Sequence, residues 1–199
     1  MRKGNFIVLE GIDFSGKTTH SKKLVDWIKS KNYRVIATEE PTEGAIGKLI
    51  RNYLNRGGVS PTVFALLFAA DRMEHIEKVI NPLISEGVIV VSDRYVESSI
   101  AYQAAGGLDV EWIETINRFA IEPDLTILLD IDPEVALTRK KEVRDSFENV
   151  EFLKKVRQIY LERARVKKHY IIDANRTIEL VHQEIVRCVE PLLLKAQNL

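Results

Sequence analysis

The stretch Gly11–Thr18 combines residue types and spacing that predict one specific kind of chemistry. Its sequence fits G-x-x-x-x-G-K-[ST], the pattern of phosphate-binding loops. Glycines let backbone N–H groups turn toward an anion, while Lys17 can reach the phosphates and the Thr18 hydroxyl can hold Mg²⁺. The alternative, a chance match in a glycine-rich turn, is disfavoured by the apolar run before the loop and the helix-length segment after it. The expected nucleotide contacts are Gly11, Ile12, Asp13, Phe14, Ser15, Gly16, Lys17, Thr18 and Thr19.

Asp93 and Arg94 form a second candidate group, one residue after the apolar run Val88–Val91. An acidic residue at the end of such a strand is the usual second element of the metal site in phosphate-loop enzymes, so Asp93 is expected to order Mg²⁺ beside Thr18. Arg94 could clamp a phosphate with its two-pronged guanidinium group. The alternatives are a helix N-cap for Asp93 and an ordinary surface ion pair for Arg94. The adjacent opposite charges at a strand end favour the functional interpretation.

Phe68 and Arg72 are four residues apart, which places them on one face of a helix. An aromatic ring and a guanidinium group are a suitable pair for a planar base, because the ring can stack and the guanidinium can donate to the base edge. A core phenylalanine beside a surface arginine has the same spacing and is the commoner arrangement. Spacing alone does not decide between the two.

Five short apolar runs must position these residues, and helix-length amphipathic segments separate them. The runs are Phe6–Leu9, Val35–Ala37, Val88–Val91, Leu125–Leu129 and Tyr170–Ile172. They lack strict alternation, as expected for strands covered on both faces. The pattern predicts a single α/β domain over residues 1–199, with a five-stranded parallel sheet between two layers of helices, the fold of P-loop NTPases. The phosphate loop, Asp93 and Arg94 follow strand ends, where ligands bind to such sheets.

Composition limits the partners. Lysine plus arginine and aspartate plus glutamate number 29 each, so no net charge favours nucleic acid or a membrane. The lone Cys188 excludes an internal disulfide, and no apolar run approaches the length of a membrane span or a signal peptide, which together predict a cytoplasmic location. The histidines have no metal-ligand spacing and are expected to pack as ordinary core or surface residues: His20, His75, His169 and His182.

Three segments together resemble the thymidylate kinase family in order and spacing: Glu10–Asp13, Phe68–Arg72 and Asp93–Gln103. The similarity extends from residue 5 to about residue 175. The resemblance implies ATP- and Mg²⁺-dependent phosphorylation of dTMP to dTDP by a homodimer. It also implies that Phe68 stacks on thymine and that Arg72 bonds the edge of that base.

The same resemblance implies roles around the acceptor. Arg94 contacts the acceptor phosphate, and Asp13 reaches the sugar 3′-hydroxyl. Tyr102 lies against the deoxyribose, where it disfavours a 2′-hydroxyl, and Ser99 and Gln103 line the base side. Lys17, Mg²⁺ and arginines would neutralise the transferring phosphoryl group, while the acceptor phosphate, already ionised near neutral pH, needs no strong base.

Two positions depart from patterns in the family. Many bacterial relatives carry an arginine where this chain has Glu39, so the acceptor-phosphate cation is either missing or supplied by Arg51. Relatives of the eukaryotic type carry an arginine inside the phosphate loop, where this chain has Phe14.

In relatives without that loop arginine, a mobile lid supplies the cation. The corresponding segment here is a short lid at about 139–150, with Arg139 and Arg144 as catalytic candidates. Arg139 could also touch adenine, and a solvated charged face is the alternative for this run. Asn175, after the last strand, lies in a segment that resembles the adenine-side loop of related nucleotide kinases.

A phosphate loop is also compatible with other functions. A deoxynucleoside kinase, or another nucleoside monophosphate kinase, could use the same scaffold. A guanine-nucleotide switch should carry an Asn-Lys-x-Asp motif, which the sequence lacks.

Overall fold

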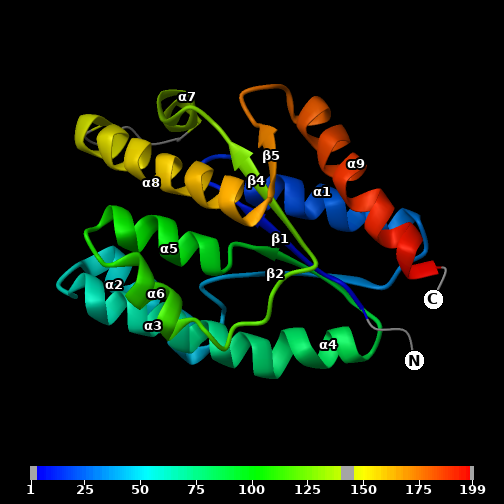
Figure 1. Ribbon diagram of the computed structural model, residues 1–199, viewed down its shortest axis with the longest axis horizontal. Coiled ribbons are helices and arrows are strands. Elements are labelled where there is room, and N and C mark those ends of the chain that lie inside the picture. The colour runs from blue at the N-terminus through cyan, green and yellow to red at the C-terminus, as the bar shows by residue number, and fades with distance from the viewer. Residues whose placement is uncertain (1–3, 140–145, 198–199) are drawn as a thin grey trace.

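The computed structural model describes residues 4–139 and 146–197 of the chain. Its centre is a sheet of five parallel strands in the order β2-β3-β1-β4-β5 (Figure 1). The strands are β1 Phe6–Glu10, β2 Val35–Glu39, β3 Ile89–Asp93, β4 Leu125–Asp130 and β5 Tyr170–Asp173. The predicted five-stranded parallel sheet flanked by helices is therefore confirmed.

Helices cover both faces of this sheet, as β1 shows. Ile7 and Leu9 belong to one buried cluster with residues of α1 (Lys17–Ser30) and α9 (Ile178–Gln197). Their neighbours Phe6 and Val8 belong to another cluster, with residues of α4 (Asn81–Ser85) and of the π-helical turn η1 that precedes it (Ile76–Ile80). Because successive strand side chains point to opposite faces, α1 and α4 lie on opposite sides of the sheet.

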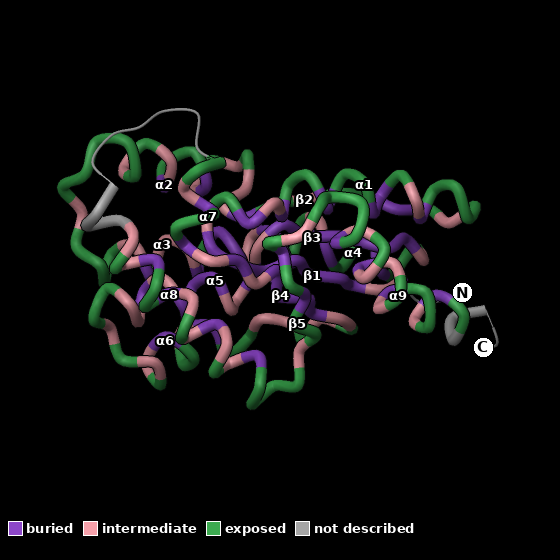
Figure 2. Tube along the Cα trace, turned by 90° about the horizontal axis from the view of Figure 1, so that it is seen from above, coloured by how far each residue is buried: buried purple, intermediate pink, exposed green. Residues whose placement is uncertain are grey.

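The edge strands differ from the central ones (Figure 2). All residues of β1 and β3 are buried, whereas Ile36 in β2 and Tyr170 in β5 are 45% and 51% exposed. The expectation that every strand is covered on both faces is therefore wrong for β2 and β5. Each edge strand has one neighbour, and the helices that cover the centre of the sheet leave part of its edges open.

The remaining helices connect and flank the strands. They are α2 Ala45–Arg56, α3 Pro61–His75, α5 Val96–Ala105, α6 Val110–Ile116, α7 Pro133–Thr138 and α8 Ser146–Lys167. α5 packs against α8, and α3 packs against both α2 and α5. Among the described residues, no helix is long and apolar enough to cross a membrane.

Candidate active site

The phosphate loop lies between β1 and α1, and its glycines are required by the backbone. Gly11 and Gly16 have φ values of 147° and 97°, a region that L side chains rarely adopt, and a Cβ on Gly11 would lie 2.7 Å from the Leu129 carbonyl oxygen. No side chain caps α1 at Gly16. The first-turn N–H groups of the helix are thus left without a side-chain acceptor, the arrangement that binds a phosphate at a helix N-terminus.

Lys17 is buried inside this loop. Its Nζ donates to the Ile12 carbonyl oxygen at 2.8 Å and to Ser15 Oγ at 3.4 Å. Burial, together with the positive charge of Arg94, lowers the pKa of Lys17 to about 7, although the acidic neighbours act to raise it. An anion placed in the loop would stabilise the charged amine.

Thr18 and Asp93 meet although they are far apart in the sequence. Thr18 Oγ1 donates to Asp93 Oδ2 at 2.6 Å, and the buried Asp93 Oδ1 has no hydrogen-bond partner within the described chain. The N-cap of α5 is Tyr95, without a side-chain hydrogen bond, so the alternative of Asp93 as N-cap is wrong. One unsatisfied carboxylate oxygen beside a hydroxyl suits Mg²⁺, a hard cation that keeps several waters and uses few protein ligands.

Arg94 follows Asp93 in a left-handed conformation, with φ at 73°. Its Nη1 donates to Ser98 Oγ at 3.1 Å, its Nη2 pairs with Asp13, and its guanidinium carbon lies 5.1 Å from the centre of the Tyr102 ring. The Tyr102 hydroxyl in turn accepts from the Asp13 backbone N–H at 2.8 Å. The Arg94 side chain is 19% exposed, so the surface-pair alternative is also wrong.

Glu10 holds the backbone that follows Arg94 in place, a role that the sequence alone did not indicate. The buried carboxylate accepts from the Tyr95 N–H at 2.8 Å, from the Ser98 N–H at 3.2 Å and from the Tyr160 hydroxyl at 3.1 Å. Burial raises the pKa of Glu10, against the lowering effect of its hydrogen bonds. These bonds tie the start of α5 and the helix α8 to the end of β1. The available signal was an acidic residue closing an otherwise apolar strand.

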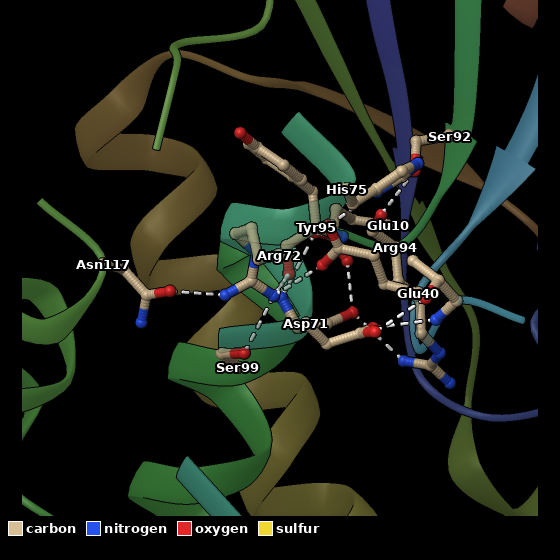
Figure 3. Close-up of polar contacts among 12 residues, drawn as sticks. Glu10, Glu40, Asp71, Arg72, His75, Ser92, Arg94, Tyr95, Ser99 and Asn117 are labelled. Carbon is tan, nitrogen blue, oxygen red and sulfur yellow. Dashed lines mark hydrogen bonds and ion pairs between the residues drawn. The ribbon is translucent and has the colours of Figure 1, made fainter. Parts of the chain in front are cut away.

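Arg72 is 1% exposed, which excludes a surface position. Figure 3 shows it between Asn117 and Ser99, where it donates to the Asn117 side chain and, at 3.0 Å in each case, to the Tyr95 carbonyl and Ser99 Oγ. Asn117 is a second residue that the sequence reasoning missed, because nothing nearby in the sequence connects it to Arg72. One turn before Arg72, the half-buried Phe68 packs near Phe64 with ring centres 6.3 Å apart.

Two cavities bring these residues together. A cavity of about 410 Å³ is lined by Phe68, Arg72, Ser99, Tyr102 and Gln103. A larger one of about 800 Å³ surrounds the phosphate loop and Asp93. Both volumes are in the range of small-molecule sites. The two cavities share the residues Asp13, Glu40, Pro41 and Arg94.

Two further arginines line the larger cavity. Arg139, the last residue of the described segment before 140, donates to the Ala174 carbonyl at 2.9 Å and lies 3.5 Å from the Phe14 carbonyl. Arg51 lies 3.4 Å from Glu39 and 2.9 Å from Glu43. Arg51, the predicted replacement for the missing acceptor-phosphate arginine, therefore lies next to Glu39, which occupies the position of that arginine.

The remaining predictions concern the adenine side and the lid. The Asn175 side chain accepts from the Asp132 N–H at 3.1 Å and donates to Asp173 at 2.7 Å, while its neighbours Ala174 and Arg176 line the larger cavity. Arg144 lies outside the described residues, as does the part of the predicted lid from 140 to 145, so its role stays a prediction.

Comparison with known proteins shows the family of this chain. The family model described as thymidylate kinase matches residues 9–185. The chain belongs to the thymidylate kinase family. A protein named probable thymidylate kinase from Thermococcus onnurineus is 46% identical, over 96% of this chain and 99% of its own length. Others with the same name, from Pyrobaculum calidifontis and Pyrococcus horikoshii, are 48% and 45% identical, over 93% and 96% of this chain and 95% and 98% of theirs.

Membership of the thymidylate kinase family makes the chain an ATP-dependent nucleoside monophosphate kinase, a transferase of nucleotide biosynthesis. The resemblance found from the three sequence segments is confirmed. The Asn-Lys-x-Asp motif of guanine-nucleotide switches is absent from the sequence, in agreement with this assignment.

Proposed function

We propose that this chain transfers the γ-phosphoryl group of ATP to dTMP, giving dTDP and ADP. The observation that carries the proposal is the meeting of the two cavities at Asp13 and Arg94. A donor held in the phosphate loop and an acceptor held beside Phe68 would place their phosphates on either side of this junction. Holding two reactants in line supplies much of the catalysis in phosphoryl transfer.

The smaller cavity is the proposed acceptor site. Phe68 stacks on the base, and Arg72 and Ser99 face its edge. Gln103 is 7% exposed, and its Oε1 has no partner among the residues that the structure describes, so it is suited to accept from an N–H of the base. The Tyr102 hydroxyl is held by Asp13, which fixes the ring against the sugar position.

The larger cavity is the proposed donor site. ATP occupies the phosphate loop from Gly11 to Thr19, with Asn175 ordering the loop at the adenine side. Thr18 and Asp93 would hold Mg²⁺, which would neutralise charge on the donor phosphates. Arg139, and Arg144 from the lid at about 139–150, are the proposed additional cations, and Arg51 serves the acceptor phosphate.

The reaction needs little covalent chemistry from the protein. An oxygen of the acceptor phosphate forms the new bond to the γ-phosphorus, and the bond from that phosphorus to the β–γ bridging oxygen breaks. Lys17 and Arg94 neutralise the charge that develops on the transferring group and on the leaving ADP. Asp13 receives the sugar 3′-hydroxyl and, through its pair with Arg94, fixes where the acceptor phosphate lies.

We also propose a homodimer in the cytoplasm. Exposed apolar side chains occur on α2 and α3, two helices that pack against each other: Leu49, Leu54, Val63 and Leu66. Burying such side chains against a second copy would remove them from water. A lone cysteine, Cys188, fits a reducing compartment.

A coupled assay of ADP release tests the proposal, with ATP and Mg²⁺ against dTMP, dUMP, dCMP, UMP and thymidine. We expect the highest kcat/KM for dTMP. Equal rates with dCMP, or a preference for thymidine, would instead indicate another nucleotide kinase or a deoxynucleoside kinase. Omitting Mg²⁺ should abolish turnover, and Asp93→Asn should raise the Mg²⁺ concentration required.

A further inference from the structure

A chain of buried polar contacts continues from Arg72 away from the acceptor cavity. Arg72 Nη2 lies 2.7 Å from Glu40 Oε2, and the other carboxylate oxygen, Oε1, lies 3.0 Å from His75 Nδ1. His75 Nε2 lies 2.6 Å from Thr38 Oγ1. The three charged or ring side chains are each at most 3% exposed. None of these contacts involves the phosphate loop.

The geometry points to a positioning relay: Glu40 and His75 hold Arg72 in the orientation in which it binds the acceptor base. Arg72 and His75 are three residues apart on α3 and therefore share a helix face. Glu40 directly follows β2 and lines both cavities. Through Glu40, the end of β2 beside the donor cavity thus fixes Arg72 in the acceptor cavity. This inference rests on the proposed role of Arg72 in base binding.

His75 matters because of what it does to the carboxylate of Glu40. The Glu40 oxygen that faces Arg72 makes an ion pair but accepts no hydrogen bond within the described chain. Without His75, the carboxylate could therefore rotate, and its other oxygen would lose its partner. His75 fixes the second oxygen, and the Thr38 hydroxyl fixes the far side of the imidazole. One consistent assignment has Nδ1–H donating to Glu40 and Nε2 accepting from Thr38. Each group then has a single orientation, and Arg72 faces a carboxylate that cannot turn away.

α3 also binds the residues that follow Glu40 in the segment after β2. Asp71 accepts from the Thr42 N–H at 2.7 Å and from its hydroxyl at 2.6 Å. The Glu40 N–H donates to the Asp93 carbonyl at 3.1 Å. Figure 3 shows Asp71, Arg72 and His75 beside Glu40. Glu40 is therefore anchored through its backbone to the strand that carries the proposed metal ligand, and through its side chain to Arg72.

Matched substitutions at position 75 test the relay. His75→Leu removes both nitrogens, His75→Asn retains an amide near the Nδ1 position toward Glu40, and His75→Gln places its amide near Nε2 instead. We expect His75→Leu to raise KM for dTMP about tenfold, as for the loss of a hydrogen bond to a charged group, with KM for ATP and kcat within about twofold. His75→Asn should restore most of the dTMP affinity, and His75→Gln should not.

A purely structural role would give a different pattern. If His75 only stabilises the fold, the variants should lower Tm and raise the KM of both substrates together, or Asn and Gln should behave alike. Either result overturns the relay, as does an unchanged KM for dTMP in His75→Leu. Thr38→Val, which keeps the shape of the side chain, should show a smaller rise in KM for dTMP and is the second variant if His75→Leu does not fold.

A double-mutant cycle separates the relay from the proposed function. In an Arg72→Ala background, His75→Leu should have no further effect on KM for dTMP, because it acts through Arg72. If Arg72→Ala itself leaves that KM unchanged, the proposed base-binding role of Arg72 fails. If Arg72→Ala raises KM and His75→Leu does not, the role of Arg72 stands and the relay alone is wrong.

Discussion

The acceptor and donor sides of the site hold their arginines in different ways. On the acceptor side, Arg72 is 1% exposed, and its partners come from α5, the residue after α6 and the segment after β2. On the donor side, Arg139 is exposed, and its bonds go to two backbone carbonyls. Arg176, which lines the same cavity, is 34% exposed at its side chain.

This difference indicates which half of the site is formed before substrate binds. A buried guanidinium with several fixed acceptors is already oriented, so binding the acceptor base loses little side-chain entropy. An exposed arginine bonded to backbone carbonyls can exchange these partners for phosphate oxygens. The acceptor side is therefore expected to tolerate substitution poorly in both folding and binding, and the donor side to lose activity without losing stability.

The largest effect is expected where the two sides meet. Arg94→Ala removes the cation at the junction of the cavities and leaves Asp13 without its ion pair. We expect kcat to fall by about 10²–10³-fold, since loss of one preorganised donor to a transition state costs this much. Steady-state kinetics with dTMP and ATP measure it. Arg94→Lys keeps the charge but loses the two-pronged guanidinium group, so it should recover only part of kcat. Full recovery would mean that the guanidinium geometry is unimportant.

Arg72→Ala should weaken both the binding of dTMP and the stability of the fold. KM for dTMP should rise by about 10–100-fold with KM for ATP unchanged. Glu40 would remain buried without its cation, which costs about 3–5 kcal/mol and should lower Tm by roughly 10 °C in a domain of this size. Differential scanning calorimetry and kinetics give the two numbers. A loss of ATP affinity equal to that for dTMP would assign Arg72 a structural role alone.

Arg139→Ala is the matched change on the donor side. Its side chain is exposed, so Tm should stay within about 2 °C of the unsubstituted protein. If it reaches the phosphates during transfer, kcat should fall about tenfold, with KM for dTMP nearly constant. Unchanged turnover would transfer this role to another cation, with Arg144→Ala and Arg51→Ala as the next variants.

The smallest expected effect is the uptake of one proton by Lys17, on the donor side, when ATP binds. Because the pKa of Lys17 is lowered to about 7, the free protein loses this proton as pH rises through neutrality. Bound phosphates would raise the pKa again, so ATP binding should take up close to one proton at about pH 8 and almost none below about pH 6. Calorimetry in buffers of different ionisation enthalpy measures the uptake. Lys17→Met is the control that subtracts protonation of ATP itself; the same uptake in that variant would contradict the assignment.

The phosphate loop and the sheet could be predicted because their signals are local. Gly11–Thr18 is one continuous stretch, and each strand is a short apolar run between amphipathic segments. The pairing of Asp93 with Thr18 followed from a general rule for strand ends. In contrast, nothing local indicated that β2 and β5 would be the exposed edges, since strand order depends on how the crossovers pack.

For Phe68 and Arg72, the sequence alone determined a shared helix face and the resemblance to a kinase family. The burial of Arg72, and the presence of Glu40, His75 and Asn117 around it, depend on the packing of distant elements and could be seen only in the folded chain. Arg72 and Asn117 are 45 positions apart, and Glu10 and Tyr160 are 150 apart. Local spacing reports which residues share a helix face or follow a strand. The partner of a buried charge is set by how distant elements pack, and that packing depends on the whole chain.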